Sequence, residues 1–279
     1  YGSHKNTLGA TLAGEVKKNV FNARTHHYKS AREKALSNNH IPEEVYDNLV
    51  KTVHKYLPLL HRYTRLRQEL LGIDDLKMYD LYTPLVKDVK FEMPYEEAKS
   101  WMLKALEPMG EEYLNVVKEG LDNRWVDVYE NKGKRSGGYS SGAHLTNPFI
   151  LLNWSDTVSD LYTLVHEFGH SAHSYFSRKH QPSNSSDYSI FVAEVASTCN
   201  EALLTEYLYN KFEKEGNKNG MLRVLNQALS GFVGTVYRQT QFAEFEHKIN
   251  QHLQNGGAIT AEYLNTEYFN LIKKYYGLS

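Results

Sequence analysis

Apolar residues recur at intervals of three and four along most of the chain, which is the spacing of one face of an α-helix. The most regular stripe consists of Leu161, Leu164, Val165, Phe168, Ala172 and Tyr175. Residues suited to a helix N-cap stand just before it, namely Ser155, Asp156 and Thr157. Asp160 places a negative charge in the first turn, which the helix dipole favours. We therefore expect a helix over residues 156–177.

The same spacing predicts further helices on the N-terminal side of this segment. Residues 1–80 carry helical apolar patterns, and another pattern begins after Pro94. Pro42 and Pro94 are each followed by acidic residues, a combination typical of a first helical turn. Gly72 follows an apolar run and suits the end of the helix that begins near Pro42.

Three more helical patterns follow on the C-terminal side. Residues 187–204 are largely apolar, with Ser186 or Asp187 as the expected N-cap. An amphipathic pattern covers residues 221–253, and a last short helix is expected over residues 260–275.

Between residues 124 and 154 the pattern changes from helical to strand-like. Residues 125–129 alternate between polar and apolar with a period of two, and residues 148–154 form an apolar run typical of a buried strand. A glycine- and serine-rich stretch separates them. The fold class predicted is therefore mainly α, with a small β-sheet that leads directly into the helix over 156–177.

Composition and charge exclude several classes of function. The chain has 279 residues, 41% of them hydrophobic, and a formal net charge of -1. A nearly neutral chain has no bulk charge with which to hold a nucleic acid or a membrane surface. One cysteine excludes a disulfide framework, and no apolar stretch is long enough for a membrane span. We expect a soluble cytoplasmic protein, and a first residue other than Met indicates a partial chain.

The helix over 156–177 contains the sequence His166-Glu167-Phe168-Gly169-His170. Residues four apart lie above one another on a helix, so both imidazoles can reach one ion. The glutamate between them can act on a water at that ion, which is the zinc-peptidase arrangement. Gly169 is unfavourable inside a helix by about 1 kcal/mol relative to alanine. We expect that close packing excludes a side chain at this position.

Catalytic zinc commonly has three protein ligands. A third histidine in the H-E-x-x-H-x-x-G-x-x-H pattern is excluded, because His173 and Phe176 occupy the required positions. Residues 187–204 offer instead a polar stripe at 194, 198, 201 and 205. We predict Glu194 as the third ligand because it lies in the most apolar sequence and a buried carboxylate needs a partner. A stripe that faces solvent is the alternative.

Other polar groups near this predicted site receive supporting roles. Thr198 and Glu201 are candidates for orienting an imidazole N–H. His173 is expected to line the cleft or to contact a ligand, since a fourth protein ligand would leave no place for water.

The glycine- and serine-rich stretch suggests a substrate contact. Gly138, Tyr139 and Ser140 would form a sheet edge to which an extended peptide adds as one more strand. A flexible hairpin turn is an equal alternative. A phosphate-binding loop is excluded, because the G-x-x-x-x-G-K-[ST] order is absent.

With these motifs, the chain resembles the thimet oligopeptidase family of zinc peptidases, on residues 166–173 and 191–194. Residues 134–142, 148–154, 187–201 and 238–246 are similar to its bacterial oligoendopeptidase F branch. The resemblance covers nearly the whole chain. It implies a large helical peptidase fold around a deep channel that admits short peptides.

The resemblance also implies roles for individual residues. It carries the zinc ligands onto His166, His170 and Glu194, and the general base onto Glu167. Family members are longer and have a C-terminal segment whose His and Tyr side chains bind the scissile carbonyl and the peptide. No match to that segment occurs in this chain, so the donors that would stabilise the transition state are unassigned.

We therefore expect a zinc-dependent endopeptidase that hydrolyses short peptides through a metal-activated water and a glutamate base. The alternatives are a related zinc carboxypeptidase or peptidyl-dipeptidase, and a non-catalytic peptide-binding protein. Residues 1–279 are predicted to form one predominantly helical catalytic region. It comprises a helical part over 1–123 and a part over 124–279 that holds the small sheet and the zinc-binding helices.

Overall fold

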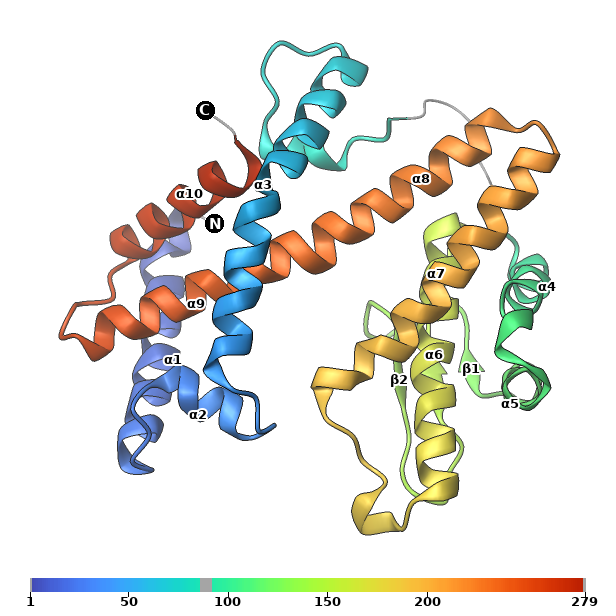
Figure 1. The fold of residues 1–279 in the computed structure, drawn as a ribbon, viewed down its shortest axis with the longest axis horizontal. Helices are drawn as coiled ribbons and strands as arrows, with labels where there is room; N and C mark the ends of the chain where they lie inside the picture. Colours follow the sequence, from blue (N-terminus) through green and yellow to red (C-terminus); the bar gives the residue numbers. More distant parts are fainter. Residues whose placement is uncertain (1, 86–91, 278–279) are drawn as a thin grey trace. The chain divides into compact units, whose positions relative to one another are not determined.

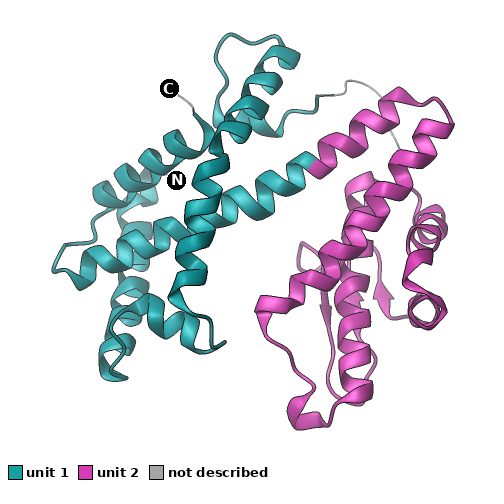
Figure 2. Ribbon diagram, viewed as in Figure 1, with its two compact units in different colours: residues 1–85, 229–279 teal, residues 86–228 magenta. Residues whose placement is uncertain are grey.

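The computed structural model describes residues 2–85 and 92–277, and these are mainly α-helical with one three-stranded sheet (Figure 1). The predicted fold class is confirmed. The chain divides into two compact units (Figure 2). Unit 1 comprises residues 1–85 and 229–279, and unit 2 comprises residues 86–228. That the whole chain forms one catalytic region, divided near residue 123, stays a prediction.

Unit 1 is built entirely of helical segments in its described part. Its helices are α1 (Lys5–Thr25), α2 (Ala31–Ser37), α3 (Glu43–Leu71), the C-terminal end of α8 (Lys218–Phe232), α9 (Arg238–Gln254) and α10 (Ala261–Tyr276). Short 3₁₀ turns cover Gly2–His4 and Met78–Tyr82, and a π-helical segment, Val233–Tyr237, joins α8 to α9.

The helix boundaries predicted for unit 1 are largely confirmed. Helix α3 begins at Glu43 with Pro42 as its N-cap, and it ends at Gly72. Gly72 has a φ of 66°, a left-handed conformation in which a side chain would be strained. Helix α10 begins after Thr260, whose hydroxyl accepts from the N–H of Tyr263.

Unit 2 contains the sheet and the motif-bearing helices. Its elements are α4 (Tyr95–Ala105), α5 (Glu111–Asp122), β1 (Val126–Asp127), β2 (Tyr139–Ser141), β3 (Phe149–Leu151), α6 (Val158–His180), α7 (Ile190–Lys214) and the start of α8, with short 3₁₀ turns at Glu107–Met109 and Ser183–Ser185. Strands β1 and β3 are shorter than the sequence pattern predicts.

The sheet has the strand order β1-β3-β2, so β2 lies at an edge. Strand β3 is central, parallel to β1 and antiparallel to β2, with Ser140 opposite Ile150. Side chains alternate between the two faces of a strand. Ile150 is 1% exposed and belongs to the same core cluster as Leu161, Leu164 and Phe168 of α6. One face of the sheet is therefore covered by α6.

Helix α6 begins where the sequence predicts. Thr157 is its N-cap: the Thr157 hydroxyl accepts from the N–H of Asp160, and the Asp160 carboxylate accepts from the N–H of Thr157. The same carboxylate also accepts from the N–H and hydroxyl of Ser155. These bonds fix the first turn of the helix directly after the sheet.

Helix α7 begins later than predicted. Its N-cap is Ser189, which accepts from the N–H of Phe191, rather than Ser186 or Asp187. Ser186 is instead the C-cap of the short Ser183–Ser185 turn, and Asp187 lies in the loop between that turn and α7. In the described ranges 2–85 and 92–277, no helix combines the length and apolar character required to cross a bilayer.

Candidate metal centre

Helices α6 and α7 lie side by side in unit 2 and carry all the candidate metal ligands (Figure 1). They pack closely at Gly169. A Cβ placed on this glycine would lie 2.6 Å from the Cα of Ser197 and 2.8 Å from the carbonyl oxygen of Ala196. Real side chains do not tolerate such distances, so the expectation that close packing excludes a side chain here is confirmed.

The crossing brings three ligand atoms together. The Nε2 atoms of His166 and His170 lie 3.1 Å apart, and Glu194 Oε2 lies 3.3 Å from each of them. Donors of a tetrahedral zinc ion with bonds of about 2.0–2.1 Å lie about 3.3–3.4 Å from one another. The separations and the donor set, two imidazoles and one carboxylate, therefore fit zinc.

Glu194 lies at the margin of the helix interface rather than within it, which corrects the reason given for choosing it. Its side chain is 54% exposed, and its neighbours Phe191 and Val195 are exposed as well. The face of α7 that is buried consists of Ala193, Ser197, Asn200 and Leu204, one residue earlier than the predicted polar stripe. Small residues at 193 and 197 permit the close approach of α6, and Glu194 projects beside it.

Glu201 also contacts one of the two histidines, His166. Its Oε1 lies 2.5 Å from Nδ1 of His166, the ring nitrogen that does not face the other ligand atoms. Burial lowers the pKa of His166, but the hydrogen bond and charge of Glu201 outweigh this and raise the pKa above its ordinary value. Thr198, by contrast, donates its hydroxyl to the Glu194 carbonyl and not to an imidazole.

Glu167 lies on the buried flank of α6, directly beside the first histidine. Burial raises the pKa of its carboxyl group, while the charge of His166 and a hydrogen bond from the backbone of Ser140 act in the opposite direction. Its Oε2 is buried and has no hydrogen-bond partner among the described residues. A buried carboxylate oxygen without a partner is costly, and a proton or a water satisfies it.

The predicted substrate edge, Gly138 to Ser140, lies next to this glutamate. A Cβ on Gly138 would lie 3.6 Å from Glu167 Oε1, and the hydroxyls of Ser140 and Ser171 are 2.8 Å apart. These contacts tie the edge strand to α6. Pairing of a peptide with this edge stays a prediction.

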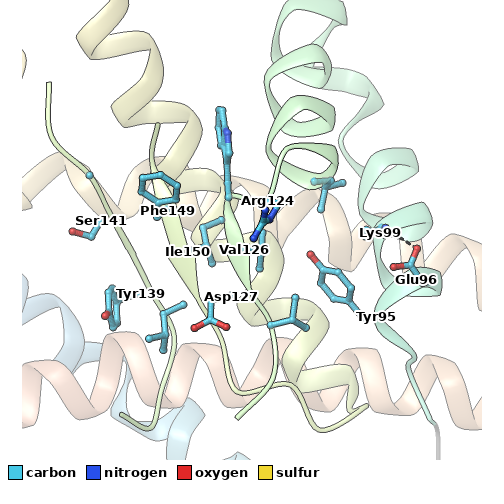
Figure 3. A pocket seen from close by; sticks show the side chains of 15 residues that line it. Tyr95, Glu96, Lys99, Arg124, Val126, Asp127, Tyr139, Ser141, Phe149 and Ile150 are labelled. Carbon is cyan, nitrogen blue, oxygen red and sulfur yellow. Dashed lines mark ion pairs between the residues drawn. The ribbon is translucent and has the colours of Figure 1, made fainter. Parts of the chain in front are cut away.

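A hollow of about 750 Å³ lies on the other face of the sheet (Figure 3). Tyr139, Ser141, Phe149 and Ile150 are among the residues that line it, while the hydroxyl of Ser140 lies 2.8 Å from that of Ser171 on α6. Tyr95 and Arg124 also line it. None of the three candidate ligands lines this hollow, so it is separate from the metal centre.

His173 is not one of the converging ligand atoms. Its ring stacks on Tyr188 with the centroids 3.7 Å apart, and the Tyr188 hydroxyl lies 2.8 Å from that of Ser174. Burial lowers the pKa of His173. The stacking gives the ring a packing role against the loop before α7.

Two contacting residues were missed by sequence reasoning. Ser197 donates to Glu194, and Asn200 donates to the carbonyl of Val165 while accepting from the hydroxyl of Tyr113. Both are fully buried. The available signal was their spacing on an apolar helix: Ser197 is four residues after Ala193, and Asn200 is three residues after Ser197, which marks the face packed against α6.

Comparison with known proteins is consistent with this centre. The sequence model of "Peptidase family M3" matches residues 1–279. The chain is 63% identical over 277 residues to "Oligopeptidase PepF" of Bacillus subtilis, covering 99% of this chain and 41% of that protein. It is 53% identical over 279 residues to "Group B oligopeptidase PepB" of Streptococcus agalactiae, covering 100% of this chain and 46% of that protein.

A solved structure shows the same fold. The crystal structure of oligoendopeptidase-F from Enterococcus faecium matches with a TM-score of 0.70 and 43% sequence identity. The match covers 99% of this chain and 42% of that chain. The chain thus spans about half the length of the relatives it matches.

Proposed function

The chain belongs to peptidase family M3, as its resemblance to thimet oligopeptidase and oligoendopeptidase F sequences predicted, and on this premise we propose that it carries the catalytic centre of a zinc-dependent endopeptidase. The proposed substrates are short peptides. His166, His170 and Glu194 are the proposed zinc ligands, and Glu167 is the proposed general base.

One observation carries this proposal most directly. Three ligand atoms from two helices lie 3.1–3.3 Å apart, at tetrahedral separations, and the residue next to the first of them is a buried glutamate with an unpartnered oxygen. A purely structural metal site has no use for that carboxylate. A hydrolytic site needs it to accept a proton.

When bound, zinc supplies a Lewis acid that polarises a carbonyl and makes water acidic at neutral pH. The protein's own residues supply the proton transfers. Glu167 accepts the proton of the attacking water on its carboxylate and returns it to the leaving amine. Burial raises the pKa of Glu167, so the protonated form costs less than it would in water.

The position of Glu167 is fixed from two sides. Helix α6 holds its backbone, and the backbone of Ser140 on β2 hydrogen-bonds its carboxylate. The edge strand therefore orients the base. If a peptide also pairs with β2, its carbonyl groups are brought close to the Glu167 carboxylate.

Two related activities are separated from this proposal by the position of cleavage. A carboxypeptidase or peptidyl-dipeptidase requires a free C-terminus, whereas an endopeptidase cleaves peptides blocked at both ends. Mass-spectrometric mapping on matched free and blocked peptides distinguishes them. Internal cleavage of the blocked peptides supports an endopeptidase, and cleavage only of free peptides contradicts it.

The catalytic role of Glu167 is tested by Glu167→Gln. The variant is expected to bind zinc with the parent's stoichiometry and to lose measurable peptide hydrolysis. Glu119→Gln removes an exposed carboxylate from α5 and is the matched control, expected to retain activity. A Glu167→Gln variant that hydrolyses peptides at the parent's rate rules out the assignment. A zinc-loaded parent that binds peptides and cleaves none favours the non-catalytic peptide-binding alternative.

A further inference from the structure

We propose that Ser197 is a positioning residue for the metal, because it holds the Glu194 carboxylate with Oε2 turned toward both histidines. This inference rests on the zinc site proposed above. Ser197 is buried and lies outside the H-E-x-x-H motif. In this role, its hydroxyl determines which oxygen of the Glu194 carboxylate becomes the ligand atom.

The contact involves the oxygen that faces the imidazoles. Ser197 Oγ lies 2.8 Å from Glu194 Oε2, and the same Oε2 lies 3.3 Å from Nε2 of His166 and of His170. A carboxylate oxygen has more than one acceptor direction. It can therefore accept from the serine hydroxyl and still present a lone pair on the side of the histidines.

Ser197 has one hydroxyl proton and two acceptors within reach, since the carbonyl oxygen of Glu194 lies 3.1 Å away. That carbonyl already accepts from the hydroxyl of Thr198. The carboxylate is charged, closer and the stronger acceptor. The serine proton is thus directed to Oε2 instead of to the backbone position that helical serines commonly use.

Glu194 needs such a restraint because little else confines it. Its side chain is 54% exposed, and Phe191 and Val195 on the same turn are themselves 61% and 64% exposed. A long, half-exposed side chain samples many rotamers, and binding an ion in only one of them has an entropic cost. Holding the carboxylate in the ligating rotamer before the ion arrives removes part of that cost.

The serine itself is fixed by the helix crossing. Ser197 is fully buried, and its Cα and N lie against Gly169, where any Cβ would approach them to 2.6 and 2.8 Å. Gly169 is the residue just before the ligand His170. The contact that sets the separation of α6 and α7 therefore also places the hydroxyl that orients the ligand from α7.

The chain offers a matched control in Ser171. This serine is also fully buried, and its hydroxyl also makes one hydrogen bond, but its partner is Ser140 and not a candidate ligand. Ser171→Ala and Ser197→Ala each remove one buried hydroxyl from the same helix pair. Loss of packing or stability affects both variants, whereas loss of ligand orientation affects only Ser197→Ala.

The test is the equilibrium zinc affinity of the purified protein, measured by competition with a chromophoric chelator. Ser197→Ala is expected to weaken zinc binding by about 10–100-fold, as for other residues that orient a metal ligand. Ser171→Ala is expected to bind zinc as the parent does. Ser197→Gly also removes the hydroxyl without adding a metal ligand, and it is expected to weaken zinc binding as Ser197→Ala does.

The outcomes separate this inference from the proposed function. If the parent binds zinc and Ser197→Ala binds it as tightly as Ser171→Ala does, the positioning role is overturned while the zinc site stands. If the parent binds no zinc, the proposed function fails and the inference fails with it. Should Ser197→Ala not fold, Ser197→Gly decides: an affinity equal to the parent's overturns the role, and a weakened affinity supports it.

Discussion

The carboxylate of Glu201 and the imidazole of His166 lie 2.5 Å apart, from Oε1 to Nδ1. This contact determines which ring nitrogen carries the proton: Nδ1–H donates to the carboxylate and leaves the lone pair of Nε2 directed toward His170 and Glu194. The same carboxylate raises the pKa of His166 and so makes the imidazole a more basic ligand.

Replacing Glu201 is expected to weaken metal binding without moving the ligands. Glu201→Ala should lower zinc affinity by about 10–100-fold, and Glu201→Gln should lower it less, because the amide oxygen still accepts from Nδ1–H. Glu206→Ala, at an exposed position on the same helix, is the control. Chelator competition measures all three variants, and parent-like affinity in Glu201→Ala would show that the contact is dispensable.

Gly169→Ala is expected to lower stability despite the better helix propensity of alanine. The propensity gain is about 1 kcal/mol, and the cost of overpacking is about 1–3 kcal/mol. The cost of overpacking should exceed the gain in helix propensity. The atoms that an added Cβ would contact are backbone atoms of Ser197 and Ala196, which cannot rotate away as a side chain can. We expect a net loss of up to about 2 kcal/mol in urea unfolding, together with weaker zinc binding.

Gly14→Ala is the control for that substitution. Gly14 lies inside α1, and an added Cβ would meet nothing within 4 Å. It should therefore raise the free energy of unfolding by about 0.5–1 kcal/mol. Equal stabilisation by both substitutions would contradict the tight crossing of α6 and α7.

A third prediction concerns a buried carboxylate in unit 1. Glu244 Oε2 accepts from the hydroxyl of Tyr275 at 3.0 Å and lies 2.7 Å from His54, while its Oε1 lies 3.3 Å from Lys274. Burial alone raises the pKa of Glu244, but these partners outweigh it and hold the pKa below its ordinary value of 4.5. Folding therefore favours the charged form.

The sign of the pH dependence follows from that direction. A carboxylate with a lower pKa in the folded protein contributes stability above pH 4.5, and this is lost as the pH falls toward its folded-state pKa. Glu244→Gln should cost about 1.5–3 kcal/mol at neutral pH, with the difference shrinking below pH 4.5. Urea unfolding of the metal-free proteins across this range measures it.

The pKa of Glu246, two residues after Glu244 on α9, is shifted in the opposite direction. Burial raises its pKa, so its charged form is disfavoured in the folded protein and the penalty grows as the pH rises. Glu246→Gln should therefore change stability in the opposite direction to Glu244→Gln. A pH-independent cost for Glu244→Gln would show that its contribution is packing and not charge.

Local signals in the sequence were sufficient for the helix that carries the motif. Thr157, Asp160 and the apolar stripe predict where α6 begins and which face it buries, and Gly169 predicts the close crossing. These features depend on residues close together in the chain. The ligand atoms His166 and His170 converge for the same reason, since helical geometry alone brings them together.

The remaining features depend on contacts between distant residues. The structure brings Glu194 next to the histidines, but the side chain lacks the burial on which its prediction as a ligand was based, because the rotation of α7 is set by its packing on α6. The pairing of His54 with Glu244 joins residues 190 positions apart, and no local pattern marks it. The hydrogen bond from Ser140 to Glu167 likewise requires the sheet and helix to be assembled first.

The central claim is that one zinc ion binds between α6 and α7. X-ray diffraction from zinc-loaded crystals, recorded on both sides of the zinc absorption edge, tests it most directly. One anomalous peak is expected about 2.0–2.2 Å from His166 Nε2, His170 Nε2 and Glu194 Oε2. The absence of a peak at that position would contradict the proposed zinc site. A zinc ion bound by Glu201 in place of Glu194 would contradict it as well.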